Sequence, residues 1–411
     1  MERRLSSLRP YLHCKHGTEA SSLRPYPHCK HGTEASSLRP YPHCKHGTEA
    51  FQPPPRMAKT HYIMNKLNLL PMLASFLLLA GITFSCVDED HIRIDDPVGN
   101  FDMLWQTIDR HYCFFSEKGI DWDDVYLKYR PLVKDDTQYL ELFSICSAML
   151  DELEDGHVNL ISSFNTSYYR RWWTDYPQDF RLRTIQEDYL KFNYLQTSGV
   201  SYAMLPDTIG YMYYPSFSYD IGELNLDYIL AILYRSKGLI IDIRDNGGGN
   251  LTNIRTLVSR LIDHKVSGGS IRHKTGPGHD DFSEPYEIFY EPCDTLRRIA
   301  YLDRPIAVLT NRSCYSAAND FVSVMKSLPN VSIIGARTGG GGGLPFNSEM
   351  PIGWGVRFSA SPMTSPGGGV TEFGIDPSPG CEVHAPDSLL IRGIDPILDF
   401  AIAHLLRTAS R

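Results

Sequence analysis

Four short apolar runs separated by helical stretches constrain the fold of this chain more than any other feature. Each run has the length and the continuous apolar character of a buried strand, and their sequences are IGYMYY, GLIIDIR, PIAVLT and VSIIG. Between and after them, apolar residues recur at helical spacing over 221–236, 252–264, 316–328 and 395–407. Because strands alternate with helices, the sequence predicts an α/β core with a largely parallel sheet over residues 209–411.

Two further helical patterns precede this core. Apolar residues recur at helical spacing over 100–112 and 138–153, and Gly156 follows the second pattern as a helix-ending residue. We therefore predict a small N-terminal helical domain over 97–160. A small mixed connecting region follows over 161–208, where the segments YYRRWW and YLKFNYL suggest short strands.

The beginning of the chain carries a repeat that is not typical of a folded domain. The 15-residue unit SSLRPYPHCKHGTEA occurs three times over residues 6–50 with one change, and it offers no apolar face to bury. Its HCKH segment is too tightly spaced to form one zinc site. We expect segment 1–63 to be disordered or to lie upstream of the true start.

A secretory signal begins at Met64. The segment MNKLNLLPMLASFLLLAGITFSC, residues 64–86, has a short basic start and an apolar run that is too short for a convincing membrane span. Its last residue, Cys86, and the acidic tether over 87–96 resemble a bacterial lipoprotein signal, which predicts lipidation at Cys86. An ordinary cleaved signal is the alternative. Both interpretations predict an exported protein, and the first predicts a lipid anchor in a membrane of the cell envelope.

The composition excludes one class of partner. Hydrophobic residues make up 42% of the 411 residues and charged residues 21%, an ordinary globular balance, and the formal net charge is -8. No basic stripe interleaved with aromatic residues is present. Nucleic acid is therefore not expected as a partner.

The segment NRSCYSAAND offers three candidate nucleophiles, Ser313, Cys314 and Ser316. Ser316 falls at the turn between the strand IAVLT and the helix that follows. A helix N-terminus favours developing negative charge, and the N–H group of Ala317 would point toward an oxyanion there. The competing interpretation is that Ser316 only caps the helix, which is the commonest role of a serine at this place.

A serine nucleophile needs a base, and His157 is the histidine that best fits this role. It follows Asp155 and Gly156 in a tight turn at the end of a helix, although a lone loop histidine is more often structural. The turn in DIRDNGGGN matches neither the dinucleotide nor the P-loop pattern. Its backbone N–H groups are candidate oxyanion donors, with a plain strand-to-helix turn as the alternative.

Six segments in a fixed order resemble one known family. They are LEDGHVNL, IGYMYYPSF, LIIDIRDNGGGN, IAVLTNRSCYSAANDF, IIGARTGGG and EFGIDP, and together they resemble the tail-specific (C-terminal processing) serine peptidase family, its tricorn-core-like branch in particular. The resemblance covers roughly residues 97–405. It implies a crotonase-like (ClpP/crotonase) α/β core with the small N-terminal helical domain in front.

The resemblance also implies a role for five residues of this chain. Ser316 matches the nucleophile of the family, and His157 matches the histidine base of the tricorn-like branch. Glu372 matches the glutamate that helps to polarise the site. Gly248 and the Ala317 amide match the oxyanion donors.

Two departures from the family pattern bear on the mechanism. The Ser–Lys branch has a lysine near the Gly-rich turn after the nucleophile helix, whereas this chain has TGGGGG there, which favours a histidine-dependent mechanism. Gly156 stands where tricorn has a serine, so the way in which Glu372 is coupled to His157 is left open. The region between His157 and residue 209 is too short for the PDZ module of many family members.

The resulting hypothesis is a serine endopeptidase that hydrolyses exported proteins or peptides by acyl transfer and needs no metal or cofactor. An unperturbed histidine base would switch activity on near pH ~6.5. A catalytically inactive peptide-binding lipoprotein with the same fold is the alternative, because a fold does not guarantee its chemistry. An acyl-CoA enzyme is disfavoured by export. The sequence leaves the substrate, the membrane face and the oligomeric state open.

Overall fold

The computed structural model describes residues 96–294 and 303–410. The repeat, the signal peptide, the expected lipidation residue Cys86 and all but the last residue of the tether lie outside the described residues. Within the described ranges, no helix combines the length and the apolar character that crossing a membrane requires.

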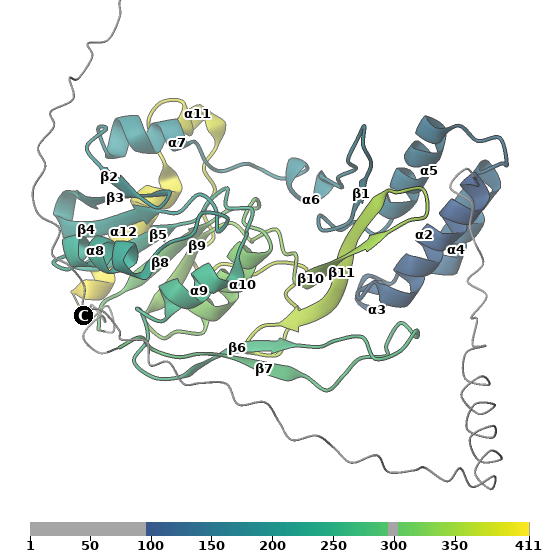
Figure 1. Ribbon diagram of the computed structural model, residues 1–411. Helices are drawn as coiled ribbons and strands as arrows, with labels where there is room; N and C mark the ends of the chain where they lie inside the picture. The colour runs from purple at the N-terminus through teal and green to yellow at the C-terminus, as the bar shows by residue number, and fades with distance from the viewer. Residues whose placement is uncertain (1–95, 295–302, 411) are drawn as a thin grey trace, which may run out of the picture. The chain divides into compact units, whose positions relative to one another are not determined.

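A six-stranded sheet forms the centre of the core (Figure 1). The four apolar runs form its parallel strands β4, β5, β8 and β9, while β2 and β3 extend one edge in antiparallel pairing. In sheet order the strands are β2 (Leu195–Thr197), β3 (Val200–Leu205), β4 (Ile209–Tyr213), β5 (Gly238–Asp242), β8 (Ile306–Thr310) and β9 (Val331–Gly335). The predicted strands and their largely parallel arrangement are confirmed.

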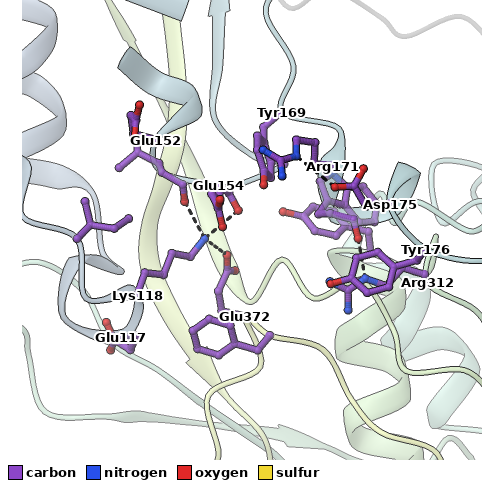
Figure 2. Close-up of a pocket in the computed structure, with 17 residues that line it drawn as sticks. Glu117, Lys118, Glu152, Glu154, Tyr169, Arg171, Asp175, Tyr176, Arg312 and Glu372 are labelled. Atoms are coloured by element: carbon purple, nitrogen blue, oxygen red, sulfur yellow. Dashed lines mark hydrogen bonds and ion pairs between the residues drawn. The ribbon is translucent and has the colours of Figure 1, made fainter. Parts of the chain in front are cut away.

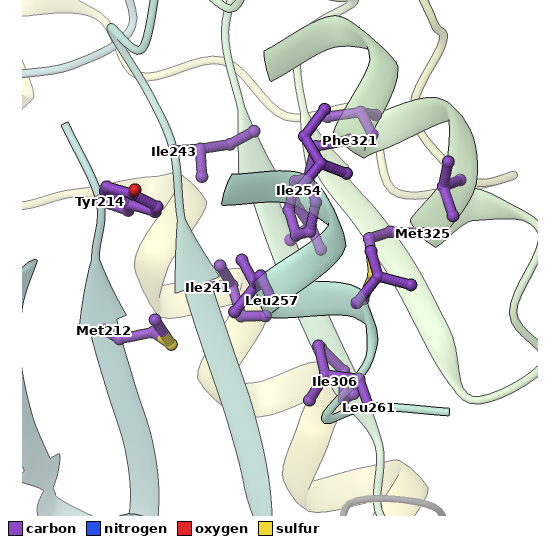
Figure 3. Close-up of a cluster of buried hydrophobic side chains, with 14 of the residues drawn as sticks. Met212, Tyr214, Ile241, Ile243, Ile254, Leu257, Leu261, Ile306, Phe321 and Met325 are labelled. Atoms are coloured by element: carbon purple, nitrogen blue, oxygen red, sulfur yellow. The ribbon is translucent and has the colours of Figure 1, made fainter. Parts of the chain in front are cut away.

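Helices cover both faces of this sheet because successive strand residues point to opposite sides. In β5, Leu239 and Ile241 pack into the cluster shared with α8, α9 and α10, whereas Ile240 packs into the cluster shared with α12. Figure 3 shows the first cluster, in which Ile241 and Phe321 are fully buried. Burying one such side chain stabilises the fold by about 1.5–3 kcal/mol. The helices are α8 (Glu223–Leu233), α9 (Leu251–Val258), α10 (Ala317–Lys326) and α12 (Pro396–Ala409). Helices α8, α10 and α12 lie close to their expected ranges, whereas α9 ends at Val258, well before the expected residue 264.

A second, five-stranded antiparallel sheet lies beside the N-terminal helices. Strand β11 is its centre, and it pairs with β1, β6 and β10. The strands are β1 (Asn159–Ile161), β6 (Val266–Ile271), β7 (Tyr286–Tyr290), β10 (Gly343–Glu349) and β11 (Gly355–Thr364).

The two predicted N-terminal helices are present as α2 (Pro97–His111) and α5 (Tyr139–Asp151). Between them lie α3 (Phe115–Lys118), α4 (Trp122–Tyr129) and the 3-10 turn η1 (Arg130–Leu132). Their core is shared with distant residues, because Phe101 and Met149 belong to the same buried cluster as Trp354 and Phe358 near and in β11. The helical segment is therefore packed against the second sheet, and the described residues 96–294 and 303–410 belong to one compact unit.

The connecting region differs from the prediction at two places. The segment YYRRWW forms no strand, since its second half begins the short helix α6 (Arg171–Thr174). In YLKFNYL only Leu195 enters a strand, because Lys191 and Phe192 have φ values of 50° and 55°, which no extended strand allows. The remaining short elements are α7 (Leu182–Thr184), the π-helical turn η2 (Ile185–Tyr189), the 3-10 turn η3 (Pro206–Thr208) and α11 (Asp387–Leu390).

Candidate active site

Ser316 lies between β8 and α10 in a strained backbone conformation. Its φ and ψ are 55° and -124°, a region that residues with side chains rarely adopt. Its N–H group donates to the Gly340 carbonyl at 2.8 Å, and its side chain makes no capping hydrogen bond to α10. The interpretation that the Ser316 side chain caps the helix is therefore wrong. Its strained backbone conformation persists only because the surrounding packing holds it.

The two rival nucleophiles have different surroundings. Cys314 is fully buried, and its thiol donates to the Ile243 carbonyl at 3.0 Å. Burial raises the pKa of this thiol well above its ordinary range, so the reactive thiolate is suppressed. Ser313 precedes the helix and lies beside the carboxylate of Asp245. Neither residue stands at the N-terminus of α10.

Gly248 lies directly against the nucleophile segment. A Cβ atom at this residue would come within 2.6 Å of the Tyr315 carbonyl oxygen and 2.9 Å of the Ala317 nitrogen. Its φ of 97° also favours glycine. The structure thus brings Gly248 and Ala317 together with Ser316, as expected from the sequence.

The amide of Gly248 already has a partner in this structure. It donates to Oδ1 of the buried side chain of Asn246 at 2.9 Å, and the Asn246 carbonyl accepts the Tyr315 N–H at 3.1 Å. Asn246 was not identified from the sequence, although it stands inside the DIRDNGGGN turn. The Ala317 amide is the first of α10 and has no acceptor within the helix. An oxyanion would therefore compete with the Asn246 side chain for the Gly248 amide, whereas the Ala317 amide has no competing acceptor within α10.

His157 is buried and packs beside the neighbour of Ser316. Its side chain is 3% exposed, and its ring centroid lies 4.9 Å from that of Tyr315, which stacks in turn on Trp172 at 4.1 Å. The backbone N–H of His157 donates to Asp155 Oδ1 at 2.7 Å. The ring Nδ1 is buried and has no hydrogen-bond partner among the described residues.

Burial lowers the pKa of His157 to about 4, although Asp155 acts in the opposite direction. The imidazole is thus neutral at neutral pH, the state that a general base requires. The expectation that this histidine titrates at its ordinary pKa is wrong, because the turn places it inside the protein.

Glu372 is buried and forms an ion pair that the sequence did not reveal. Its Oε1 lies 2.8 Å from the Nζ atom of Lys118, and its Oε2 accepts the Gly342 N–H at 3.0 Å. Burial and the nearby carboxylate of Asp155 raise the pKa of Glu372 to about 8, against the effect of Lys118. Lys118 ends a helix of four residues, and no spacing pattern links it to Glu372.

Asp155 is the second carboxylate of this cluster. Its oxygens accept hydrogen bonds from the hydroxyl groups of Tyr112, Tyr315 and Ser359 at 3.1, 3.2 and 2.8 Å, besides the His157 N–H. Burial alone would raise its pKa, but Lys118, His157 and the Ser359 hydroxyl group hold the pKa below its ordinary value. Asp155 therefore stays charged and ties the His157 turn to the segment that carries Ser316.

A cavity of about 580 Å³ adjoins this cluster (Figure 2). Gly156, Tyr315 and Glu372 line it, each next to or part of the predicted machinery. Figure 2 shows Lys118, Glu152 and Glu154 around Glu372 on one side, and Arg171, Tyr176 and Arg312 on the other. Within the described ranges, no group of three or more histidine, cysteine or carboxylate side chains is arranged to hold a metal ion.

Comparison with known proteins identifies the family. Residues 208–378 match the sequence profile of peptidase family S41, and residues 95–151 match the tricorn protease C1 domain. A peptidase candidate from Parabacteroides merdae, known from a crystal structure, is 48% identical, with 76% of this chain and 97% of that chain covered at a TM-score of 0.71. This chain belongs to peptidase family S41. The predicted membership in the tail-specific and tricorn-like serine peptidases is thereby confirmed.

Two further relatives of this S41 chain match it over only a small share of their own length. The tricorn protease of Thermoplasma acidophilum is 29% identical over 212 residues, which are 48% of this chain and 17% of tricorn. A protein of Chlamydia trachomatis is 32% identical over 94 residues, or 23% of this chain and 16% of that protein. The chain thus spans about a sixth of the curated relatives it matches. Mature CPAF, 13% identical with a TM-score of 0.59 over 77% of this chain and 98% of its own, shares the fold.

Proposed function

We propose that this S41 peptidase is a serine endopeptidase with Ser316 as the nucleophile and His157 as the base. The observation that carries the proposal is the strained serine at the N-terminus of α10, packed against Gly248 and followed by the open amide of Ala317. In the scheme we propose, the core is crotonase-like, and the N-terminal helical domain supplies His157.

The proposed reaction is peptide-bond hydrolysis in two acyl-transfer steps. The neutral imidazole of His157 takes the Ser316 proton while the serine oxygen attacks the substrate carbonyl. The oxyanion of the tetrahedral intermediate is placed at the N-terminus of α10, where the Ala317 amide and then Gly248 donate to it. His157 returns the proton to the leaving amine, and water releases the acyl group by the same route.

The substrate and the location belong to the same proposal. Exported proteins or peptides are the expected substrates, and Cys86 is the expected lipid attachment residue at the cell envelope. Both rest on the signal-like segment 64–86, since the described residues begin at 96.

Labelling with a fluorophosphonate probe tests the nucleophile. We expect label on the wild-type protein, no label on Ser316→Ala, and unchanged label on Ser313→Ala and Cys314→Ala. The two latter variants are matched controls because they lie within the same loop. Label that persists in Ser316→Ala and disappears in Cys314→Ala would transfer the role to the thiol. Peptide binding without label or turnover in any form would favour the inactive binding protein.

A further inference from the structure

Glu372 and His157 stand on different parts of the fold, and no direct bond joins them. Within the described residues, neither a hydrogen bond nor an ion pair connects the Glu372 carboxylate to the His157 ring. His157 precedes β1, whereas Glu372 follows β11. A glutamate that assists this histidine therefore needs an intermediary.

Lys118 makes the contacts that an intermediary requires. Its Nζ atom lies 2.8 Å from Glu372 Oε1, 3.1 Å from the Leu153 carbonyl oxygen and 3.2 Å from the Glu154 carbonyl oxygen. These three acceptors use all three protons of an ammonium group. The side chain of Lys118 is 9% exposed, so solvent screens these contacts little. Figure 2 shows the ammonium between Glu372 and the chain at Glu154.

The two carbonyl groups directly precede the turn that carries the base. Leu153 and Glu154 are followed by Asp155, Gly156 and His157. Glu154 has a φ of 47°, so the chain enters the turn in a conformation that needs outside support. By binding both carbonyls, the ammonium of Lys118 holds this end of the turn at a fixed place relative to Glu372.

We propose that Lys118 is a positioning residue that couples Glu372 to His157. Its ammonium pairs with the Glu372 carboxylate in a buried site and so favours the ionised form against burial, and it fixes the turn that orients the His157 ring. This proposal rests on the proposed function, since it assumes that His157 is the base.

Lys118 is not itself the base of a Ser–Lys pair. Burial alone would lower its pKa, but Asp155 and Glu372 raise the pKa above its ordinary value, so the amine stays protonated. A cation whose three protons are all donated has no lone pair to accept a proton from serine. Its effect is therefore exerted through Glu372 and the turn.

The test is the pH dependence of peptidase activity in Lys118→Met. Without the ammonium, Asp155 and Glu372 are two buried carboxylates with no shared cation, and Glu372 will protonate first. The ionised form of Glu372 will then appear only at higher pH, and the acidic limb of kcat/KM should move to higher pH by about 1 unit or more. We also expect kcat to fall roughly 10- to 100-fold with little change in KM, because the turn loses its support.

Lys128→Met is the matched control. Lys128 also pairs with a glutamate, at 2.6 Å from Glu152 Oε1, but its side chain is 60% exposed. We expect Lys128→Met to keep the wild-type acidic limb of kcat/KM and the wild-type kcat, because an exposed ion pair contributes little to the stability of the local structure.

A double-variant cycle separates coupling from general damage. If Lys118 acts through Glu372, then Lys118→Met combined with Glu372→Gln should lose little more activity than the worse single variant. An unmoved acidic limb in folded Lys118→Met, or fully multiplicative losses in the double variant, would overturn the proposal. If Lys118→Met does not fold, Lys118→Arg is the deciding variant, because it keeps the positive charge but not the three donor positions of lysine. An acidic limb of kcat/KM at the wild-type pH together with a reduced kcat would support the proposal. A wild-type kcat would overturn it.

The two proposals fail differently. A wild-type protein labelled at Ser316, with Lys118→Met unaffected, overturns only the coupling by Lys118. Absence of Ser316 labelling in the wild-type protein overturns the proposed function and the coupling together.

Discussion

Two neighbouring residues with unusual backbone angles, Ser316 and Gly248, shape the centre of the candidate site. Ser316 tolerates a φ of 55° although it has a side chain, and Gly248 has a φ of 97° and no room for one. Such conformations cost about 1–3 kcal/mol each, so the surrounding packing must hold them. Asn246 provides part of this packing, because its side chain binds Phe217, Gly248 and Tyr214.

The conversion of Gly248 to alanine should abolish most activity. The new Cβ would meet the Tyr315 oxygen and the Ala317 nitrogen and would displace the two candidate oxyanion donors. We expect kcat to fall by about 100- to 1,000-fold, the range for the loss of one oxyanion donor. Gly247→Ala is the control, because a Cβ there meets nothing within 4 Å. Equal activities of the two variants in a peptide-cleavage assay would contradict the role of Gly248.

The pH dependence of activity should follow Glu372 rather than His157. The pKa of His157 is about 4, so the imidazole of this candidate base is neutral throughout the neutral range. The pKa of Glu372 is about 8, so its carboxylate ionises as the pH rises through that value. If the ionised form is required, kcat/KM should rise through about pH 8 in the wild-type protein. In Glu372→Gln this limb should vanish, leaving a lower rate that is flat down to the titration of His157. A wild-type limb that persists in Glu372→Gln would assign it to another group.

At the scale of elements, a buried ion pair joins the end of β5 to the start of α12. The Arg244 guanidinium lies 2.6 Å from Asp242 Oδ2 and 2.7 Å from Asp395 Oδ2, and all three side chains are fully buried. Asp395 also caps α12, since its Oδ1 accepts the N–H groups of Ile397 and Leu398. The turn that contains Gly248 thus follows Arg244, which is bound to the start of α12. Helix α12 packs on the opposite face of the sheet from α10.

Replacing Asp395 with alanine should destabilise the fold strongly. The change leaves Arg244 with one buried partner fewer and removes the cap of α12. Breaking a buried pair in this way costs about 3–5 kcal/mol. Asp96→Ala is the comparison, because Asp96 caps α2 through Gly99 and has no buried ion pair with any described residue. Its loss should cost about 0.5–2 kcal/mol. Denaturant unfolding measures both; similar losses would show that the Arg244 pair adds nothing beyond the cap.

At the scale of the whole molecule, the candidate site is assembled from segments far apart in the chain. Lys118 and His157 belong to the part before residue 160, while Ser316 and Glu372 belong to the part after it. The shared cluster around Trp354 and Phe358 packs the early helices against β11 and so holds the two parts in register.

The processing of the chain is tested on protein isolated from its native host. We expect translation to start at Met64 and the mature protein to begin with a lipid-bearing Cys86. Intact mass spectrometry would give the mass of this form. Peptides of the SSLRPYPHCKHGTEA repeat in the mature protein would show that the upstream segment is retained, and a different first residue would remove the lipid anchor from the proposal.

The sequence by itself determined the elements whose signal is local. Strands β4, β5, β8 and β9 were predictable because each is a continuous run of apolar residues, which is typical of a strand buried on both faces. The helices between them were predictable because apolar residues recur at helical spacing within each segment. The position of Ser316 at a strand-to-helix turn and of His157 in a tight turn follow in the same way. YYRRWW and YLKFNYL were misjudged because packing of Trp172 on Tyr315 and the positive φ values at Lys191 and Phe192 have no local signal.

Only the tertiary structure decided the charge states and partners within the site. The low pKa of His157 and the high pKa of Glu372 arise from burial, which depends on segments distant in the chain. The contact of Lys118 with Glu372 and the occupation of the Gly248 amide by Asn246 are likewise matters of distance in space. The electrostatic energy of a charged group depends on its distance from other charges and on the surrounding dielectric, and the amino-acid sequence alone gives neither quantity.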